Sequence, residues 1–102
     1  MTYAFIQDVP IREEMYAQIR QALGTTPPAG MISHVVIEKD DGTLRYVDVW
    51  ESEAAWERFA ETALHPIISG IFQRAGFVPA GEPPLQAIRV IDTWGAAPVA
   101  AG

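Results

Sequence analysis

Two histidines are the clearest candidates for acid–base chemistry in this chain of 102 residues. His34 lies between Ile32 and Val36 in a strand-like run, where burial would keep the imidazole neutral near pH 7 and able to act as a general base. The alternative is a buried or interface histidine that bonds a backbone carbonyl or a carboxylate. His65 precedes Pro66 at an expected helix break, so it either faces a cleft or caps a helix C-terminus. Two histidines without spaced carboxylates do not predict a metal site.

Asp48 is a candidate catalytic residue because of its neighbours. Tyr46, Asp48 and Trp50 alternate along one expected strand and therefore share a face. A carboxylate between two aromatic residues on an apolar face needs a polar partner. In a site, Asp48 would orient a histidine or accept a substrate proton, while Tyr46 and Trp50 would contact an aromatic ligand. Alternatively, Asp48 pairs with Arg89 or with a tyrosine at a dimer interface.

A helical stripe of large apolar residues follows this strand. Most of the stripe should be core, which is the usual role of such a pattern. Some members are also candidate ligand contacts, since a pocket between helix and sheet would be lined by them. The stripe consists of Trp56, Phe59, Ile68, Ile71 and Phe72.

These residues must be positioned by six elements in the order β-α-β-β-α-β. Gly24 should end the first helix and Ser52 should cap the second, which Pro66 should break or kink near His65. Residues 1–94 form the single predicted domain and 95–102 a tail. The expected elements are a strand over Tyr3–Asp8, a helix over Ile11–Leu23, strands over Met31–Lys39 and Leu44–Trp50, a broken helix from Ser52 to Ala75, and a strand over Leu85–Thr93.

The turn between the second and third strands should set their register. Asp41-Gly42 favours a two-residue type I′ turn. That turn would place Glu38 beside Arg45, a favourable cross-strand pair, and His34 beside Val49. A slip of one residue would exchange the two faces.

Composition excludes several classes of function. The net charge is −6 and no basic run occurs, which argues against nucleic acid and anionic membranes as partners. The chain has no cysteine, no export signal and no apolar run long enough for a membrane span, so we expect a cytoplasmic protein. The hydrophobic fraction of 49% is high for one small domain. An antiparallel sheet with helices on one face leaves its other apolar face for a second copy, so we expect a homodimer through that face.

The element order and the segment from Val47 to Trp56 resemble the antibiotic biosynthesis monooxygenase-like family of dimeric α/β barrels. The shared feature is a strand that ends in an aromatic residue, followed by a Ser or Asp cap and a Glu-Ala-aromatic helix start. The resemblance covers roughly residues 3–94 and implies an α+β, ferredoxin-like domain with an antiparallel sheet. It also implies a pocket between the broken helix and the sheet.

The better-known sites of this superfamily do not match the chain. Heme-degrading relatives have an Asn late in strand one, a Trp in the helix after strand three and a more distal His; Gln7 or Asp8, Phe59 and Ser69 occupy those positions here. No heme and no other cofactor is therefore expected.

Two functions follow from the resemblance. The first is a cofactor-independent monooxygenase, or a related isomerase or cyclase, acting on an aromatic or polyketide-like molecule. In it His34 or His65 would be the base, Tyr46 and Arg89 the donors, and Trp50 and Trp56 the walls. The second is a non-catalytic barrel that carries a small apolar ligand or has a pocket filled by side chains.

Overall fold

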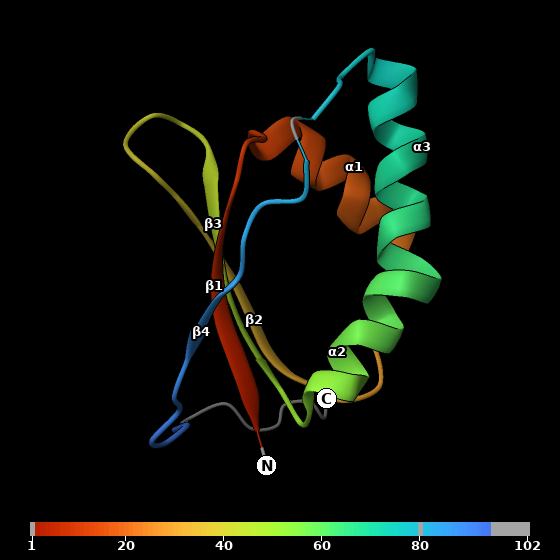
Figure 1. The fold of residues 1–102 in the computed structure, drawn as a ribbon. Coiled ribbons are helices and arrows are strands. Elements are labelled where there is room, and N and C mark those ends of the chain that lie inside the picture. Colours follow the sequence, from red (N-terminus) through yellow and green to blue (C-terminus); the bar gives the residue numbers. More distant parts are fainter. Residues whose placement is uncertain (1, 80, 95–102) are drawn as a thin grey trace.

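The chain folds into a four-stranded antiparallel sheet with all its helices on one face (Figure 1). The structure is a computed structural model that describes residues 2–79 and 81–94, so the expected tail lies outside the described residues. The strands lie in the order β2-β3-β1-β4, which confirms the α+β, ferredoxin-like prediction. The elements are β1 (Tyr3–Val9), α1 (Glu13–Leu23), β2 (Met31–Glu38), β3 (Leu44–Trp50), α2 (Glu53–Phe59), the π-helix η1 (Ala60–Leu64), α3 (His65–Ala75) and β4 (Gln86–Ile88).

The turn between β2 and β3 has three residues rather than the expected two. Gly42 N donates to Lys39 O at 2.9 Å and Lys39 N to Thr43 O at 2.8 Å, while Gly42 has a φ of +87°. This is a turn closed by a left-handed glycine, the common three-residue hairpin. The extra residue shifts the register by one, so the predicted pairing of Glu38 with Arg45 is wrong.

The shifted register brings different residues together. His34 lies opposite Asp48 rather than Val49, and Val36 lies opposite Tyr46. Directly opposed residues share a face of the sheet. His34 and Asp48 are therefore on one face, the face that the helices cover.

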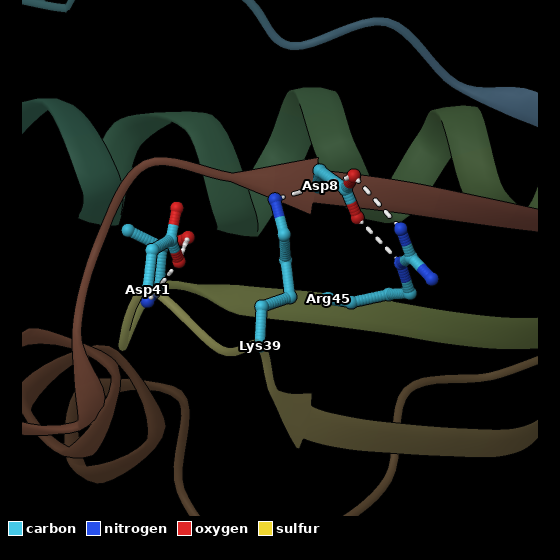
Figure 2. A network of polar contacts seen from close by, with 5 residues as sticks. Asp8, Lys39, Asp41 and Arg45 are labelled. Atoms are coloured by element: carbon cyan, nitrogen blue, oxygen red, sulfur yellow. Dashed lines mark hydrogen bonds and ion pairs between the residues drawn. The ribbon is translucent and has the colours of Figure 1, made fainter.

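Arg45 finds its acidic partner on β1 instead of β2 (Figure 2). Its Nε donates to Asp8 Oδ1 at 2.6 Å, its second nitrogen donates to Asp8 Oδ2 at 3.1 Å, and Lys39 Nζ lies 3.5 Å from the same carboxylate. The hydrogen bond and charge of Arg45 lower the pKa of Asp8. In the turn itself, Asp41 accepts bonds from the backbone and hydroxyl of Thr43.

The second helical region is continuous where a break was expected. Ser52 caps it as predicted, its Oγ accepting from Ala55 N at 3.1 Å. Before Pro66 the helix widens into the π-helix η1, in which His65 N donates to Ala60 O. A proline lacks the N–H of a normal helical turn and crowds the carbonyl four residues back, so a wider turn accommodates it without a break. His65 is therefore inside a helix, and its predicted alternative as a C-terminal cap is wrong.

The helices cover only one of the two faces of the sheet (Figure 1). The helix-covered face contains two core clusters, one around Phe5, Trp50 and Trp56 and one around Ile19 and Ile71. The opposite face, which we call the open face, carries Val35, Val47 and Val49 of β2 and β3. Val35 is 48% exposed and Ile37 45% exposed.

The last strand is shorter than predicted. β4 spans three residues, whereas the sequence predicts a strand over Leu85–Thr93. Ile88 lies opposite Ala4, and β1 begins at Tyr3, so the residues after Ile88 have almost no β1 residues left to pair with. The chain beyond Ile88 extends past the end of its neighbouring strand, and Arg89 is exposed there. Within the described part of the chain, no helix is both long and apolar enough to cross a membrane.

Candidate functional site

A cavity of about 680 Å³ lies between the sheet, α3 and the segment that follows α3. Gly76, at φ +70°, ends α3 and turns the chain back over the helix, so that the rings of Phe72 and Phe77 pack 4.7 Å apart. The lining is mostly apolar, with polar side chains at a few points. It includes Gln7, Val9 and Tyr46 from the sheet, Trp56, Leu64, His65, Ile68, Ser69, Phe72 and Gln73 from the helices, and Phe77, Val78, Glu82 and Pro83 from the returning segment.

Two polar contacts attach the returning segment to the body of the domain. Gln7 Nε2 donates to the carbonyl of Pro83 at 3.0 Å, and His65 Nε2 lies 3.3 Å from Glu82 Oε2. Gln7 is 6% exposed, whereas the His65 and Glu82 side chains are 47% and 58% exposed. The returning segment is therefore held by a buried contact at β1 and by a solvent-exposed contact at α3.

His65 has the surroundings of a general base. Its ring borders the cavity and one nitrogen faces a carboxylate, which can hold the ring in one orientation and stabilise the imidazolium. It occupies this place because η1 adds a wide turn just before it. The second ring nitrogen is then available for proton transfer.

His34 belongs to a chain of hydrogen bonds next to the cavity. Its Nδ1 lies 2.7 Å from Asp48 Oδ1, and its Nε2 lies 2.9 Å from the Tyr16 hydroxyl. The other oxygen of Asp48 accepts from Trp50 Nε1 at 3.0 Å. Because a carboxylate only accepts, Nδ1 of a neutral His34 carries the proton and Nε2 accepts from Tyr16. Both histidines thus have protein partners.

Tyr46 separates this hydrogen-bonded chain from the cavity. Its ring packs edge-on against His34 at 5.3 Å and against Tyr16 at 5.7 Å, and Tyr46 itself lines the cavity. Burial strongly raises the pKa of Tyr46, with smaller contributions from Tyr16 and the Asp48 carboxylate. The Tyr46 phenol is therefore neutral at physiological pH and can donate a hydrogen bond.

The structure divides the predicted site residues into two groups. His65, Tyr46, Trp56 and Phe72 line the cavity. The second group, away from the lining, consists of His34, Asp48, Trp50, Phe59 and Arg89.

The second group has structural partners of its own. Trp50 is fully buried, with its ring 5.4 Å from that of Phe59. Asp48 bonds His34 and Trp50, so its expected pairing with Arg89 is wrong. Arg89 lies just beyond the end of β4 and is exposed to solvent.

Sequence reasoning missed Gln7, Glu82 and Tyr16. Gln7 falls at a family position in the sequence, but its spacing gives no signal for its contact with Pro83. Tyr16 lies three residues before the buried Ile19, so the helical repeat already places it near the sheet. Glu82 lies in a loop, where spacing carries no such signal. Among the described residues, no three His, Asp or Glu side chains are grouped to hold a metal ion.

Solved structures share this fold at low sequence identity. A protein of Chloroflexus aurantiacus described as a "putative antibiotic biosynthesis monooxygenase" matches with a TM-score of 0.61 and 18% identity, over 93% of this chain and 98% of its own. Rv0793 of Mycobacterium tuberculosis matches with a TM-score of 0.58 and 17% identity, over 93% and 100%. A protein of Deinococcus radiodurans with the same description as the first has a TM-score of 0.55 and 15% identity, over 96% and 100%. No family model and no curated protein matches the sequence. These likenesses confirm the predicted antibiotic biosynthesis monooxygenase-like fold.

Proposed function

We propose that this chain, which has the antibiotic biosynthesis monooxygenase-like fold, is a cofactor-independent oxygenase or related enzyme acting on an aromatic or polyketide-like molecule. One observation carries the proposal: an apolar cavity of about 680 Å³ borders a histidine that faces a carboxylate. Drug-sized ligands occupy pockets of roughly 300–1,000 Å³, so the volume suits a molecule of two or three fused rings.

The chemistry needs no group beyond the substrate and oxygen. His65 would remove a proton from an activated CH₂ flanked by aromatic rings, and Glu82 would stabilise the imidazolium. The carbanion then gives its electrons to O₂, so that CH₂ becomes C=O and the second oxygen atom leaves as water. The carbon loses four electrons and O₂ gains four, so the reaction balances. Tyr46, as a neutral donor, would stabilise the oxygen on which negative charge develops.

The test is oxygen consumption with an anthrone, which carries a CH₂ between two aromatic rings. The His65→Gln variant should lose about 100-fold in kcat, at the lower end of what a general base contributes. Glu82→Gln should lose less, and Glu61→Gln, which makes the same charge change at an exposed helical position outside the cavity, should keep full activity.

Two results would count against the proposal. One is no turnover by the wild type, and the other is full activity in His65→Gln. If instead His34→Gln abolishes turnover while His65→Gln does not, His34 is the base that the sequence also predicted. In that case the Tyr16 hydroxyl must move away from His34 Nε2, because the two atoms lie 2.9 Å apart.

The second candidate function is a carrier without catalysis. It is supported by the protein partners of both histidines, which leave His34 without a free nitrogen. The variant of this idea in which side chains fill the pocket is disfavoured by the open cavity. A carrier would bind an anthraquinone tightly and consume no oxygen with any anthrone.

We further propose that two copies pair through the open face, in line with the dimer expected from the sequence. Val35 and Ile37 expose large apolar side chains on a face that none of the described helices covers (Figure 1). Ile37→Lys should shift the protein to monomers in analytical ultracentrifugation. Val78→Lys, at a position 88% exposed in the segment after α3 and outside the open face, is the matched control and should leave the mass unchanged. The cytoplasmic location stays a prediction.

A further inference from the structure

Gln7 and Tyr46 form a polar pair on the sheet side of an otherwise apolar cavity. They lie directly opposite each other on β1 and β3, and both line the cavity. Directly opposed side chains have Cβ atoms about 4.5–5.5 Å apart and point to the same side of the sheet. Two polar groups are therefore held next to each other on neighbouring strands.

The hydrogen-bonding role of Gln7 is fixed by its partner. The Pro83 carbonyl can only accept, so the group that faces it is the NH₂ of the carboxamide. The carboxamide oxygen accepts no hydrogen bond from any residue of 2–79 and 81–94. In the described part of the chain, every buried side-chain nitrogen and oxygen atom has a hydrogen-bond partner. An oxygen without a partner is therefore not buried. The oxygen therefore opens onto the cavity as an acceptor.

Tyr46 supplies the opposite role. Its phenol stays protonated because burial raises its pKa, and no described residue accepts a bond from its hydroxyl. The hydroxyl proton is therefore available to a ligand. One side of the cavity offers an acceptor and a donor side by side, and the remaining lining is mainly apolar.

We propose that Gln7 and Tyr46 together recognise a ligand that carries a carbonyl and a nearby hydroxyl that cannot hydrogen-bond to it, such as a hydroxyaryl ketone with the hydroxyl meta or para to the carbonyl. Gln7 Oε1 accepts from the hydroxyl and the Tyr46 hydroxyl donates to the carbonyl. A ligand with a carbonyl alone leaves the Gln7 oxygen unpaired in a dry site, which costs affinity. This inference rests on the proposed function only in taking the cavity as the ligand site.

The test is binding, at pH 6 where the phenol probe is neutral, of three stable probes that cannot turn over: 2-hydroxyanthraquinone, 2-methoxyanthraquinone and anthraquinone. Quenching of tryptophan fluorescence reports binding, because Trp56 lines the cavity. The wild type should bind the hydroxy probe about tenfold more tightly than either other probe, as expected for one buried hydrogen bond.

Two variants assign the two roles. Gln7→Leu should bind all three probes alike, because the acceptor is gone. Tyr46→Phe should weaken the binding of all three probes by a similar factor, because the Tyr46 hydroxyl donates to a carbonyl that all three carry. The preference for the hydroxy probe should remain. Phe72→Leu, which changes only the apolar wall, should also keep the preference.

Equal affinity of the wild type for the three probes would overturn this inference and leave the proposed function standing. An unchanged preference in Gln7→Leu would overturn it as well. Absence of binding by every probe would overturn both. Since the first comparison needs only the wild type, the inference stays falsifiable if Gln7→Leu fails to fold.

Discussion

Replacing Asp48 with alanine should destabilise the domain by about 4 kcal/mol, because the donors on Trp50 and His34 both lose their acceptor. Trp50 is fully buried, so its Nε1–H has no access to water once Asp48 is gone. That loss should lie near the top of the range of ~1–3 kcal/mol for an unpaired buried group. The His34 side chain is 20% exposed and can regain water, so its share should lie near the bottom of that range.

Asp48→Asn should cost about 1 kcal/mol or less, because the chain of bonds can re-form without charge. The asparagine oxygen would accept from Trp50 Nε1, and its NH₂ would donate to His34 Nδ1. His34 would then carry its proton on Nε2 and donate it to the Tyr16 hydroxyl. Each original contact keeps one donor and one acceptor, which alanine cannot provide.

Urea unfolding at pH 7, followed by far-ultraviolet circular dichroism, measures both variants. All proteins must be compared at one concentration, because pairing of copies would add to the apparent stability. Asp40→Ala removes a carboxylate from the exposed turn and should stay within ~0.5 kcal/mol of the wild type. Equal losses in the alanine and asparagine variants would refute the reasoning, because they would make the charge of Asp48 the stabilising feature rather than the satisfied bonds.

Three further changes test other parts of the structure. Gly42→Ala should cost ~1–2 kcal/mol in the same assay, because the turn needs φ +87°, and an unchanged midpoint would contradict the turn geometry. Arg45 lowers the pKa of Asp8 below its ordinary 3.8, so this ion pair stabilises the fold above pH 3.8 and loses its effect as the pH falls through the pKa of the folded state. Asp8→Asn should therefore lose stability less steeply than the wild type below about pH 4. An identical acid profile of the two proteins would argue against the pair. Tyr16→Phe should cost ~1 kcal/mol by removing the donor to His34, and no change would indicate that water replaces it.

The fold was largely readable from the sequence because its signals are local. The apolar stripe before Gly24 and the Ser52 cap correspond to α1 and α2, and the run Leu44–Trp50 matches β3 at both ends. The hairpin register was not readable in this way. Asp41-Gly42 suits both a two-residue turn and a three-residue turn closed by glycine, and only the pairing with β1, where Arg45 meets Asp8, distinguishes them.

The site was less predictable because it depends on contacts between distant segments. Asp48 was expected to need a polar partner, which could be a histidine, Arg89 or a tyrosine. It bonds His34 and Trp50, and the one-residue shift is what places His34 opposite it. Glu82 meets His65 across 17 positions, and Gln7 meets Pro83 across 76. Neither contact follows from spacing along the chain, since each depends on how the segment after α3 returns over the sheet.

The π-helix has a consequence for how this site arose. A π-turn amounts to one extra residue in an α-helix, and each residue advances a helix by about 100°. The extra residue within Ala60–Leu64 therefore sets the direction in which the later side chains of the helix point. These include His65, Ser69 and Phe72 on the cavity wall. Deleting one residue there would restore a regular helix and rotate those side chains by about a quarter turn relative to α2. A single inserted codon in an ancestral gene would have been enough to aim His65 at the cavity.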